Sequence, residues 1–109
     1  MSEVFTLESD KVLNRTLFNN FGKVLLFLFY SESNQSSLNF KENLIATIPL
    51  FGQFPNVKYF LISAEKCPET FKKFKVESTP TVILTQTDKK ELRRFETDDV
   101  GVVLDGVAE

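Results

Sequence analysis

A length of 109 residues fits one compact domain and leaves no room for a second. The composition, 42% hydrophobic and 26% charged, is that of an ordinary globular protein, and a formal net charge of −2 argues against a dedicated nucleic-acid binder. With no His and one Cys, the chain lacks the residues for a Cys–His or Ser–His–Asp nucleophile, an intramolecular disulfide or a Cys-rich metal site.

The first elements are a short strand and a helix. Residues 3–7 alternate in the manner of a strand, and Ser9 and Asp10 offer N-cap chemistry for a helix that Gly22 ends. The apolar side of that helix is predicted to hold Val12, Leu13, Leu17, Phe18 and Phe21.

An almost unbroken apolar run of strand length follows at residues 23–30. Such a run predicts a central strand covered on both faces, which requires helices on both sides of a sheet. Residues 31–37 have the small, polar composition of a strand-to-helix turn. A second amphipathic helix is predicted from Ser37, and Pro49 either ends it or kinks it because proline lacks the amide that a helix interior needs.

Residues 57–62 predict a second buried strand, which leads to a helix with Pro68 at its first position. The apolar side of this helix is carried by Phe71, Phe74 and Val76. Most of the twelve Phe are expected to fill a dry core, because a phenyl ring has no polar atom to satisfy.

The last third predicts a strand at 81–85, a turn at 87–90, a strand at 92–95 and a weak final helix from Asp98 and Asp99. The whole order, β-α-β-α-β-α-β-β-α, is that of a single α/β domain over residues 1–109 with three layers and a mixed sheet.

Two short motifs accompany this order. Phe29-Tyr30-Ser31-Glu32 closes the central strand, and Thr79-Pro80-Thr81 opens a later one. With them the chain resembles the thioredoxin family, which implies the thioredoxin fold, a three-layer α/β/α arrangement with a central mixed sheet and a cis-proline loop. The pattern A-E-x-x-P-E at residues 64–69, followed by S-x-P-T at residues 78–81, is similar to the N-terminal thioredoxin domain of multidomain monothiol glutaredoxins of the PICOT type.

The resemblance also shows what this chain has lost. Thioredoxins carry two cysteines in the turn after the central strand, and the matching positions here are Ser33, Asn34, Gln35, Ser36 and Ser37. Hydroxyls and amides cannot enter thiol–disulfide exchange, which needs a thiolate. The buried Asp and Lys of the family correspond to Leu28 and Leu61, and losing both partners together avoids stranding a buried charge.

Three groups of residues are candidate sites. By the resemblance, the Thr79–Pro80 bond is expected to be cis, which leaves backbone groups of Ser78 and Thr79 facing the turn at residues 34–37 and open to an extended peptide; a shaped turn without a ligand is the alternative. The helix start at residues 34–37 is expected to be an ordinary N-cap by Asn34 or Ser36, with a carboxylate site, as for glutathione, as the alternative.

Cys67 is the third candidate. We expect it to be a small, partly buried filler; the alternative is a reactive thiol, because Cys67 stands just before a helix start, where the helix dipole would favour its thiolate.

We therefore expect a redox-inactive, non-enzymatic protein-binding module without metal or cofactor, whose partner is another protein or a neighbouring glutaredoxin domain. The family setting implies redox homeostasis and iron–sulfur handling. The rival is a monothiol or glutathione-linked oxidoreductase that uses Cys67. Residues 1–10 lack the basic and apolar runs of a signal peptide, and the run at residues 24–30 is too short to span a bilayer, so we expect a cytoplasmic protein that contacts no membrane.

Overall fold

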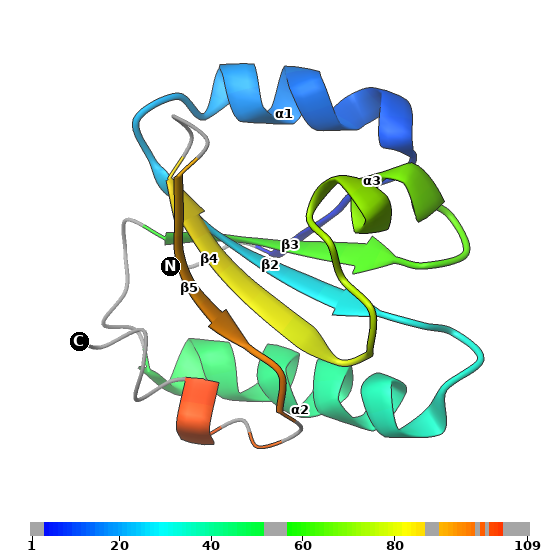
Figure 1. Cartoon of the computed structure of the whole chain (residues 1–109). Helices are drawn as coiled ribbons and strands as arrows, with labels where there is room; N and C mark the ends of the chain where they lie inside the picture. Colours follow the sequence, from blue (N-terminus) through cyan, green and yellow to red (C-terminus); the bar gives the residue numbers. More distant parts are fainter. Residues whose placement is uncertain (1–3, 52–56, 87–89, 98, 100, 104–109) are drawn as a thin grey trace.

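The computed structural model describes residues 4–51, 57–86, 90–97, 99 and 101–103, and its centre is one five-stranded sheet (Figure 1). The strand order is β1-β3-β2-β4-β5; β1 and β2 run parallel to β3, β4 runs antiparallel to β2, and β5 antiparallel to β4. The strands are β1 (Val4–Thr6), β2 (Val24–Tyr30), β3 (Val57–Ser63), β4 (Thr81–Gln86) and β5 (Lys90–Phe95).

Helices cover both faces of this sheet. A 3₁₀ turn at Asp10–Val12 leads into α1 (Leu13–Asn19), which shares one face with α3 (Pro68–Lys73) (Figure 1). The opposite face carries α2 (Gln35–Phe51) and the helical residues 101–103. The element order and the mixed sheet between two helical layers confirm the predicted three-layer α/β architecture.

The two faces of β2 anchor two apolar clusters, because successive side chains of a strand point to opposite sides. Leu25, Phe27 and Phe29 pack toward α1 and α3, and Leu26, Leu28 and Tyr30 toward α2. The first cluster is an aromatic network in which the Phe27 ring lies 5.8 Å from Phe60 and 5.5 Å from Phe74, edge to face in both cases. Phe29 meets Phe71 at 5.1 Å. Such pairs add to the burial energy of each ring.

Among the Phe side chains that the structure describes, two are strongly exposed and depart from the expectation of a dry core. Phe18 and Phe21 are 78% and 74% exposed, so their predicted place on the buried side of the first helix is wrong. The reason is the length of α1, only seven residues, in which Leu13 and Leu17 share the inner face at i and i+4 spacing. Phe18 is one residue further round the helix, and Phe21 lies beyond the end of α1.

The predicted helix boundaries need three corrections. Ser9 occupies the N-cap position of the 3₁₀ turn but makes no side-chain cap bond. The Asp10 carboxylate instead accepts hydrogen bonds from the Thr70 amide at 2.8 Å and the Thr70 hydroxyl at 2.6 Å, and so caps α3. The second helix begins at Gln35 rather than Ser37, and it continues through Phe51, so Pro49 does not end it.

Gly22 has a φ of 83°, a left-handed conformation that favours glycine, and it lets the chain turn from α1 into β2 as predicted. Pro68 occupies the first turn of α3, also as predicted. The predicted turn at residues 87–90 lies mostly outside the described residues, as do residues 98, 100 and 104–109 of the predicted last helix.

Among the residues that the structure describes, no helix combines the length and apolar character needed to cross a bilayer. Within the same residues, no three His, Cys, Asp or Glu side chains gather in a way that could hold a metal ion.

Candidate functional site

The turn between β2 and α2 is closed by its own side chains. The Asn34 side-chain oxygen accepts a hydrogen bond from the Ser37 amide at 3.0 Å, so Asn34 is the N-cap of α2 and Ser36 is not. Ser37 is fully buried; its hydroxyl accepts from the Ser31 amide at 3.0 Å and lies 2.9 Å from the Ser31 carbonyl oxygen and 3.0 Å from that of Asn34. The predicted N-cap reading is confirmed, and the Ser37 hydroxyl is committed to holding the turn.

Glu65, which follows β3, holds the same turn from the side. Its carboxylate accepts from the Ser31 hydroxyl at 2.7 Å, the Glu32 amide at 2.9 Å and the Ser33 hydroxyl at 3.3 Å. The hydrogen bond from Ser31, followed by that from the Glu32 amide, lowers the pKa of Glu65 to about 2. The buried Ser63 hydroxyl completes the contact at 3.1 Å from Glu65. The Glu65 carboxylate beside the turn is therefore negatively charged near neutral pH.

This role of Glu65 was not predicted. The signal lies in the parallel pairing of β2 and β3, whose register sets Tyr30 beside Ser63 at the carboxyl ends of both strands. Residues that follow two neighbouring parallel strands meet at one sheet edge, which brings Glu65 against Ser31 across 34 positions of sequence. The position also belongs to the A-E-x-x-P-E pattern noted above.

The loop before β4 lies next to this turn. The Thr79–Pro80 peptide bond is cis, and Ser78, Thr79 and Pro80 line an open depression of about 350 Å³. Ser36 lines the same depression from α2, together with Glu96 and Thr97 from the segment after β5. The Ser78 carbonyl oxygen accepts a hydrogen bond from the Thr81 hydroxyl at 2.7 Å, so one of the backbone groups predicted to face a ligand is already engaged.

The structure therefore brings together part of the predicted site. Ser36 meets residues 78–80 in one depression, whereas Ser33, Asn34 and Ser37 make the internal bonds described above. Gln35 is exposed and donates from its side chain to Asn39 one helical turn later at 2.9 Å. The carboxylates of Glu65 beside the turn and Glu96 in the depression make this end of the sheet acidic, which disfavours the carboxylate of glutathione as an occupant.

Cys67 is a filler of the core, as expected, and not the reactive thiol of the alternative reading. It is fully buried in the cluster beneath α1 and α3, and its Sγ donates to the Leu7 carbonyl oxygen at 3.5 Å. Burial, with the nearby Asp10 carboxylate, raises the pKa of this thiol instead of lowering it. The alternative of a thiolate activated by the start of α3 is therefore wrong, because burial disfavours the charged form of the thiol.

Leu28 and Leu61 are direct register partners in the adjacent strands β2 and β3. Both belong to the apolar cluster on the α2 side, with exposed fractions of 0% and 9%. The two positions are thus close neighbours inside the core, which is the arrangement that a buried Asp–Lys pair would need. In this chain both side chains are apolar and contribute to the packing of the core.

This architecture is the thioredoxin fold. The sequence matches no protein-family model and no curated protein. Solved structures match over nearly the whole chain, among them a thioredoxin of Fasciola hepatica, with a TM-score of 0.80, 19% identity and coverage of 94% of this chain and 95% of that one.

Two further thioredoxin structures fit as well. The reduced thioredoxin pre-protein of Schistosoma mansoni gives a TM-score of 0.84 at 15% identity, with coverage of 97% of this chain and 96% of that one. A thioredoxin of Nicotiana alata gives 0.84 at 15% identity, with coverage of 98% and 91%. At these identities the likeness establishes the fold, and the chemistry of the chain has to be argued from its own residues.

Proposed function

We propose that this chain is a redox-inactive thioredoxin-fold domain that binds an extended segment of a protein partner in the depression between Ser36 and residues 78–80. The observation that carries the proposal is the joining of these two segments in one open hollow, although they lie far apart in sequence. Many proteins bind an extended peptide through main-chain groups at the edge of a sheet, with an adjacent pocket that accepts a side chain of the peptide. Glu96 in the wall favours a basic side chain in the bound segment.

The absence of dithiol chemistry rests on the residues of the turn. No sulfur stands between Ser31 and Ser37, and the chain's one thiol is the buried Cys67. The burial of Cys67 counts against the rival monothiol oxidoreductase, since a thiol must be reached by its disulfide partner and must ionise to attack it.

The resemblance to the N-terminal domain of PICOT-type monothiol glutaredoxins suggests a context for the partner. In that setting the domain docks proteins for, or supports, a neighbouring glutaredoxin domain in iron–sulfur handling. A full-length gene that encodes a C-G-F-S domain after this chain would support this part of the proposal, and a gene without one would remove it.

The docking site is tested by filling the depression. Ser36 and Ala46 are both exposed positions of α2, about 15 Å apart along the helix axis. Affinity capture from lysate of the source organism with the wild-type chain, Ser36→Trp and the matched control Ala46→Trp should recover partners that only Ser36→Trp loses. Equal recovery by all three chains would contradict the proposal.

The redox part is tested separately by insulin reduction with dithiothreitol. We expect no acceleration over buffer, either by the wild-type chain or by Cys67→Ser. Acceleration by the wild-type chain that disappears in Cys67→Ser would establish the rival activity instead.

A further inference from the structure

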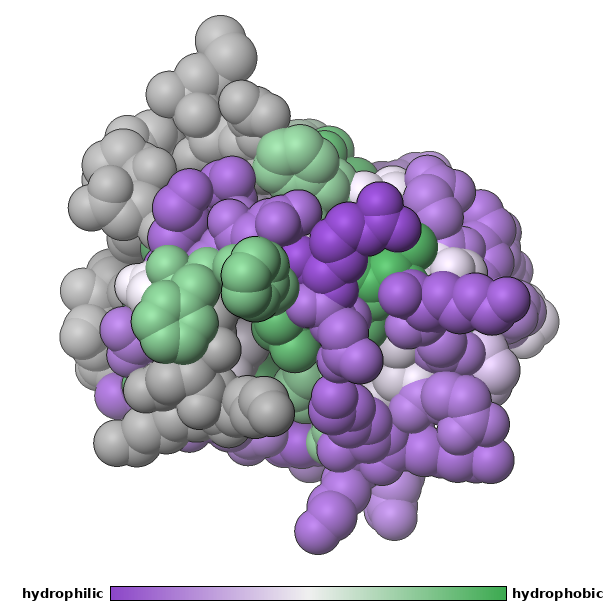
Figure 2. All heavy atoms as spheres, turned by 90° about the horizontal axis from the view of Figure 1, so that it is seen from above, coloured by the Kyte–Doolittle hydropathy of each residue, from purple (hydrophilic) through white to green (hydrophobic). Residues whose placement is uncertain are grey.

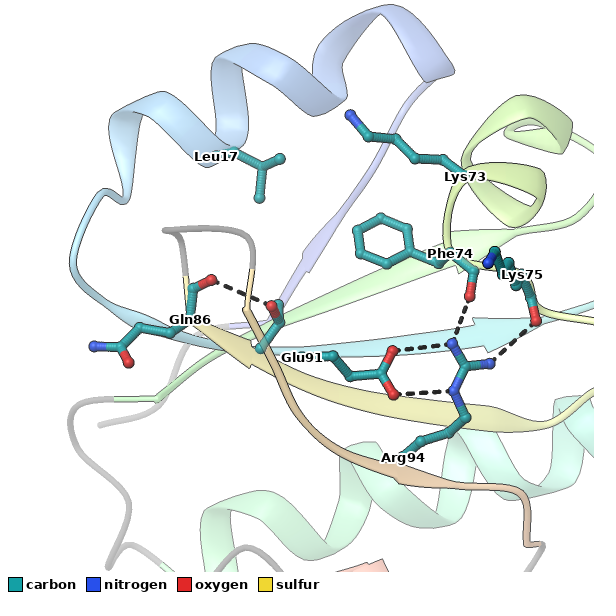
Figure 3. A pocket seen from close by; sticks show the side chains of 8 residues that line it. Leu17, Lys73, Phe74, Lys75, Gln86, Glu91 and Arg94 are labelled. Carbon is teal, nitrogen blue, oxygen red and sulfur yellow. Dashed lines mark hydrogen bonds and ion pairs between the residues drawn. The ribbon is translucent and has the colours of Figure 1, made fainter.

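A second hollow lies on the other side of the sheet, between α1, the end of α3 and the strands β4 and β5 (Figure 3). Its volume is about 300 Å³, enough for a large apolar side chain. Leu17 from α1 and Phe74 after α3 supply apolar walls, and Figure 3 shows both side chains pointing into the space above β5. We call this hollow the α1–β5 groove.

The floor of the α1–β5 groove is fixed and electrically balanced. Arg94 of β5 donates from Nε and Nη2 to the Glu91 carboxylate at 3.2 and 3.0 Å. The same guanidinium donates to the carbonyl oxygens of Phe74 and Lys75, the latter at 3.2 Å. A side chain held by four hydrogen bonds keeps its shape when a ligand arrives, so little ordering entropy remains to be lost there on binding.

The rim of the groove is basic. Lys73 and Lys75 line it, and within the described part of the chain neither ammonium group has a hydrogen bond or ion pair. The neighbouring segment, residues 11–23, adds Lys11, Arg15 and Lys23 and contains no Asp or Glu. Asp10 and Glu69, which share a smaller hollow with Lys73, are already engaged by Thr70 and by Lys72. In a chain whose net charge is −2, the positive side chains at the groove therefore favour an acidic partner.

Two exposed aromatic side chains follow Leu17, which lines the groove, in the chain. Phe18 and Phe21 are 78% and 74% exposed, and they lie three residues apart in the same stretch as Leu17. Seen from above, Figure 2 shows hydrophobic atoms at the surface of this face between hydrophilic ones. Exposed apolar groups next to a hollow mark interaction surfaces in soluble proteins.

From these observations we infer that the α1–β5 groove and Phe18 and Phe21 form a docking surface for an acidic, amphipathic segment of a protein partner. An aromatic or aliphatic side chain of that segment enters between Leu17 and Phe74, and its Asp or Glu residues pair with Lys73 and Lys75. The surface lies on the opposite side of the sheet from α2 and does not depend on the function proposed above.

A second copy of this chain is a poorer occupant. Its exposed Phe18 and Phe21 would arrive on a segment that carries three positive charges and no negative one, against a rim that is itself positive. An anionic membrane matches the charge but not the shape, because the two lysines border a hollow that a flat surface cannot enter. Both are distinguishable outcomes of the experiment below.

The test uses a random 12-residue peptide library displayed on phage and panned against the whole chain. Selection is subtracted against the double variant Phe18→Ser/Lys73→Glu. We expect enriched peptides with at least one aromatic or aliphatic anchor and an excess of Asp and Glu. Binding of a synthesised hit, followed by fluorescence anisotropy, should weaken at least fivefold in Lys73→Glu and in Phe18→Ser.

Two variants serve as matched controls. Lys66→Glu makes the same charge change at an exposed position after β3, and Val102→Ser removes a 47% exposed apolar side chain on the α2 side. Both should bind the hit as the wild-type chain does. Circular dichroism and urea unfolding of every variant confirm that a loss of binding is not a loss of folding.

Several results would overturn the inference. These are the absence of any enriched peptide, a consensus without acidic residues, and an affinity that Lys73→Glu leaves unchanged. Sedimentation of the chain with phosphatidylserine vesicles that depends on Phe18 and Lys73, without selection of an acidic peptide, would assign the surface to a membrane. A dimer that Phe18→Ser dissociates would assign it to self-association.

Discussion

Leu28→Asp tests whether the paired leucines of β2 and β3 tolerate the charge that the resemblance places there. Leu28 has no exposed surface, so the substitution forfeits about 1.5–3 kcal/mol of apolar burial. Placing an unpaired carboxylate in the same cluster adds an effective penalty of several kcal/mol. We expect a combined loss of about 4–6 kcal/mol at pH 7, a large part of the roughly 5–15 kcal/mol available to a domain.

The pH dependence separates the charge from the lost packing. Burial raises the pKa of the new carboxyl above the value of about 3.9 in the unfolded chain, so the folded state holds its proton more tightly. The charge penalty is therefore absent below about pH 4 and grows by up to about 1.4 kcal/mol per pH unit as the pH rises from there. Leu28→Asn, which cannot ionise, should lose stability by an amount that does not vary with pH in this way.

The double variant Leu28→Asp/Leu61→Lys completes a double-mutant cycle, which measures the interaction between the two substitutions. Because the two positions are register partners, the new Lys faces the new Asp, and we expect a favourable coupling of about 1–3 kcal/mol between the substitutions. Urea unfolding followed by circular dichroism between pH 4 and 8 measures all four chains. A loss below about 1 kcal/mol in Leu28→Asp, or a double variant no better than the sum of the single ones, would refute the reasoning.

Three further predictions concern single residues. Asp10→Ala removes the cap of α3 and leaves the buried Thr70 hydroxyl without its acceptor, so urea unfolding should show a loss of about 2–3 kcal/mol; a loss under about 0.5 would contradict the capping role. Because the pKa of Glu65 falls from 4.5 unfolded to about 2 folded, its contribution is present above pH 4.5 and disappears as the pH falls through 2; Glu65→Gln should flatten the stability curve in that window, and an unchanged curve would count against the contact with Ser31. Cys67 should react with Ellman's reagent roughly 100-fold or more slowly in the folded chain than in guanidinium, and equal rates would show that the thiol is open.

The elements of this fold could be predicted from the sequence because their signals are local. An unbroken apolar run gave β2, and Pro68 marked the first turn of α3. Contacts between distant segments carry no such signal. Asp10 caps a helix 60 positions away, where local reasoning expected Ser9 and Asp10 to cap the helix that follows them.

Short helices were the other weak point. Of the five apolar residues expected on one side of the first helix, Val12 and Phe21 lie outside the two turns of α1. Within α1, packing in the cluster that contains β2 residues buries Leu13 and partly buries Leu17, whereas Phe18 is exposed. For Cys67 the position at a helix start and the expected role as a filler were correct, and the alternative of an activated thiol was not. The sequence does not say how deeply a side chain is buried, and the raised pKa of this thiol results from its burial.

The side chains of the β2–α2 turn are engaged in hydrogen bonds within the turn and with Glu65. The Asn34 side chain caps α2, and the Ser37 hydroxyl is hydrogen-bonded to the backbone of the turn. The hydroxyls of Ser31 and Ser33 are bound to Glu65. A hydroxyl becomes a nucleophile only with a base to take its proton; the chain has no His, and the Glu65 carboxylate that accepts from Ser31 and Ser33 has a pKa of about 2, which makes it a weak base near neutral pH. In the function proposed above, the partner binds in the hollow beside Ser36, and such binding needs no nucleophile.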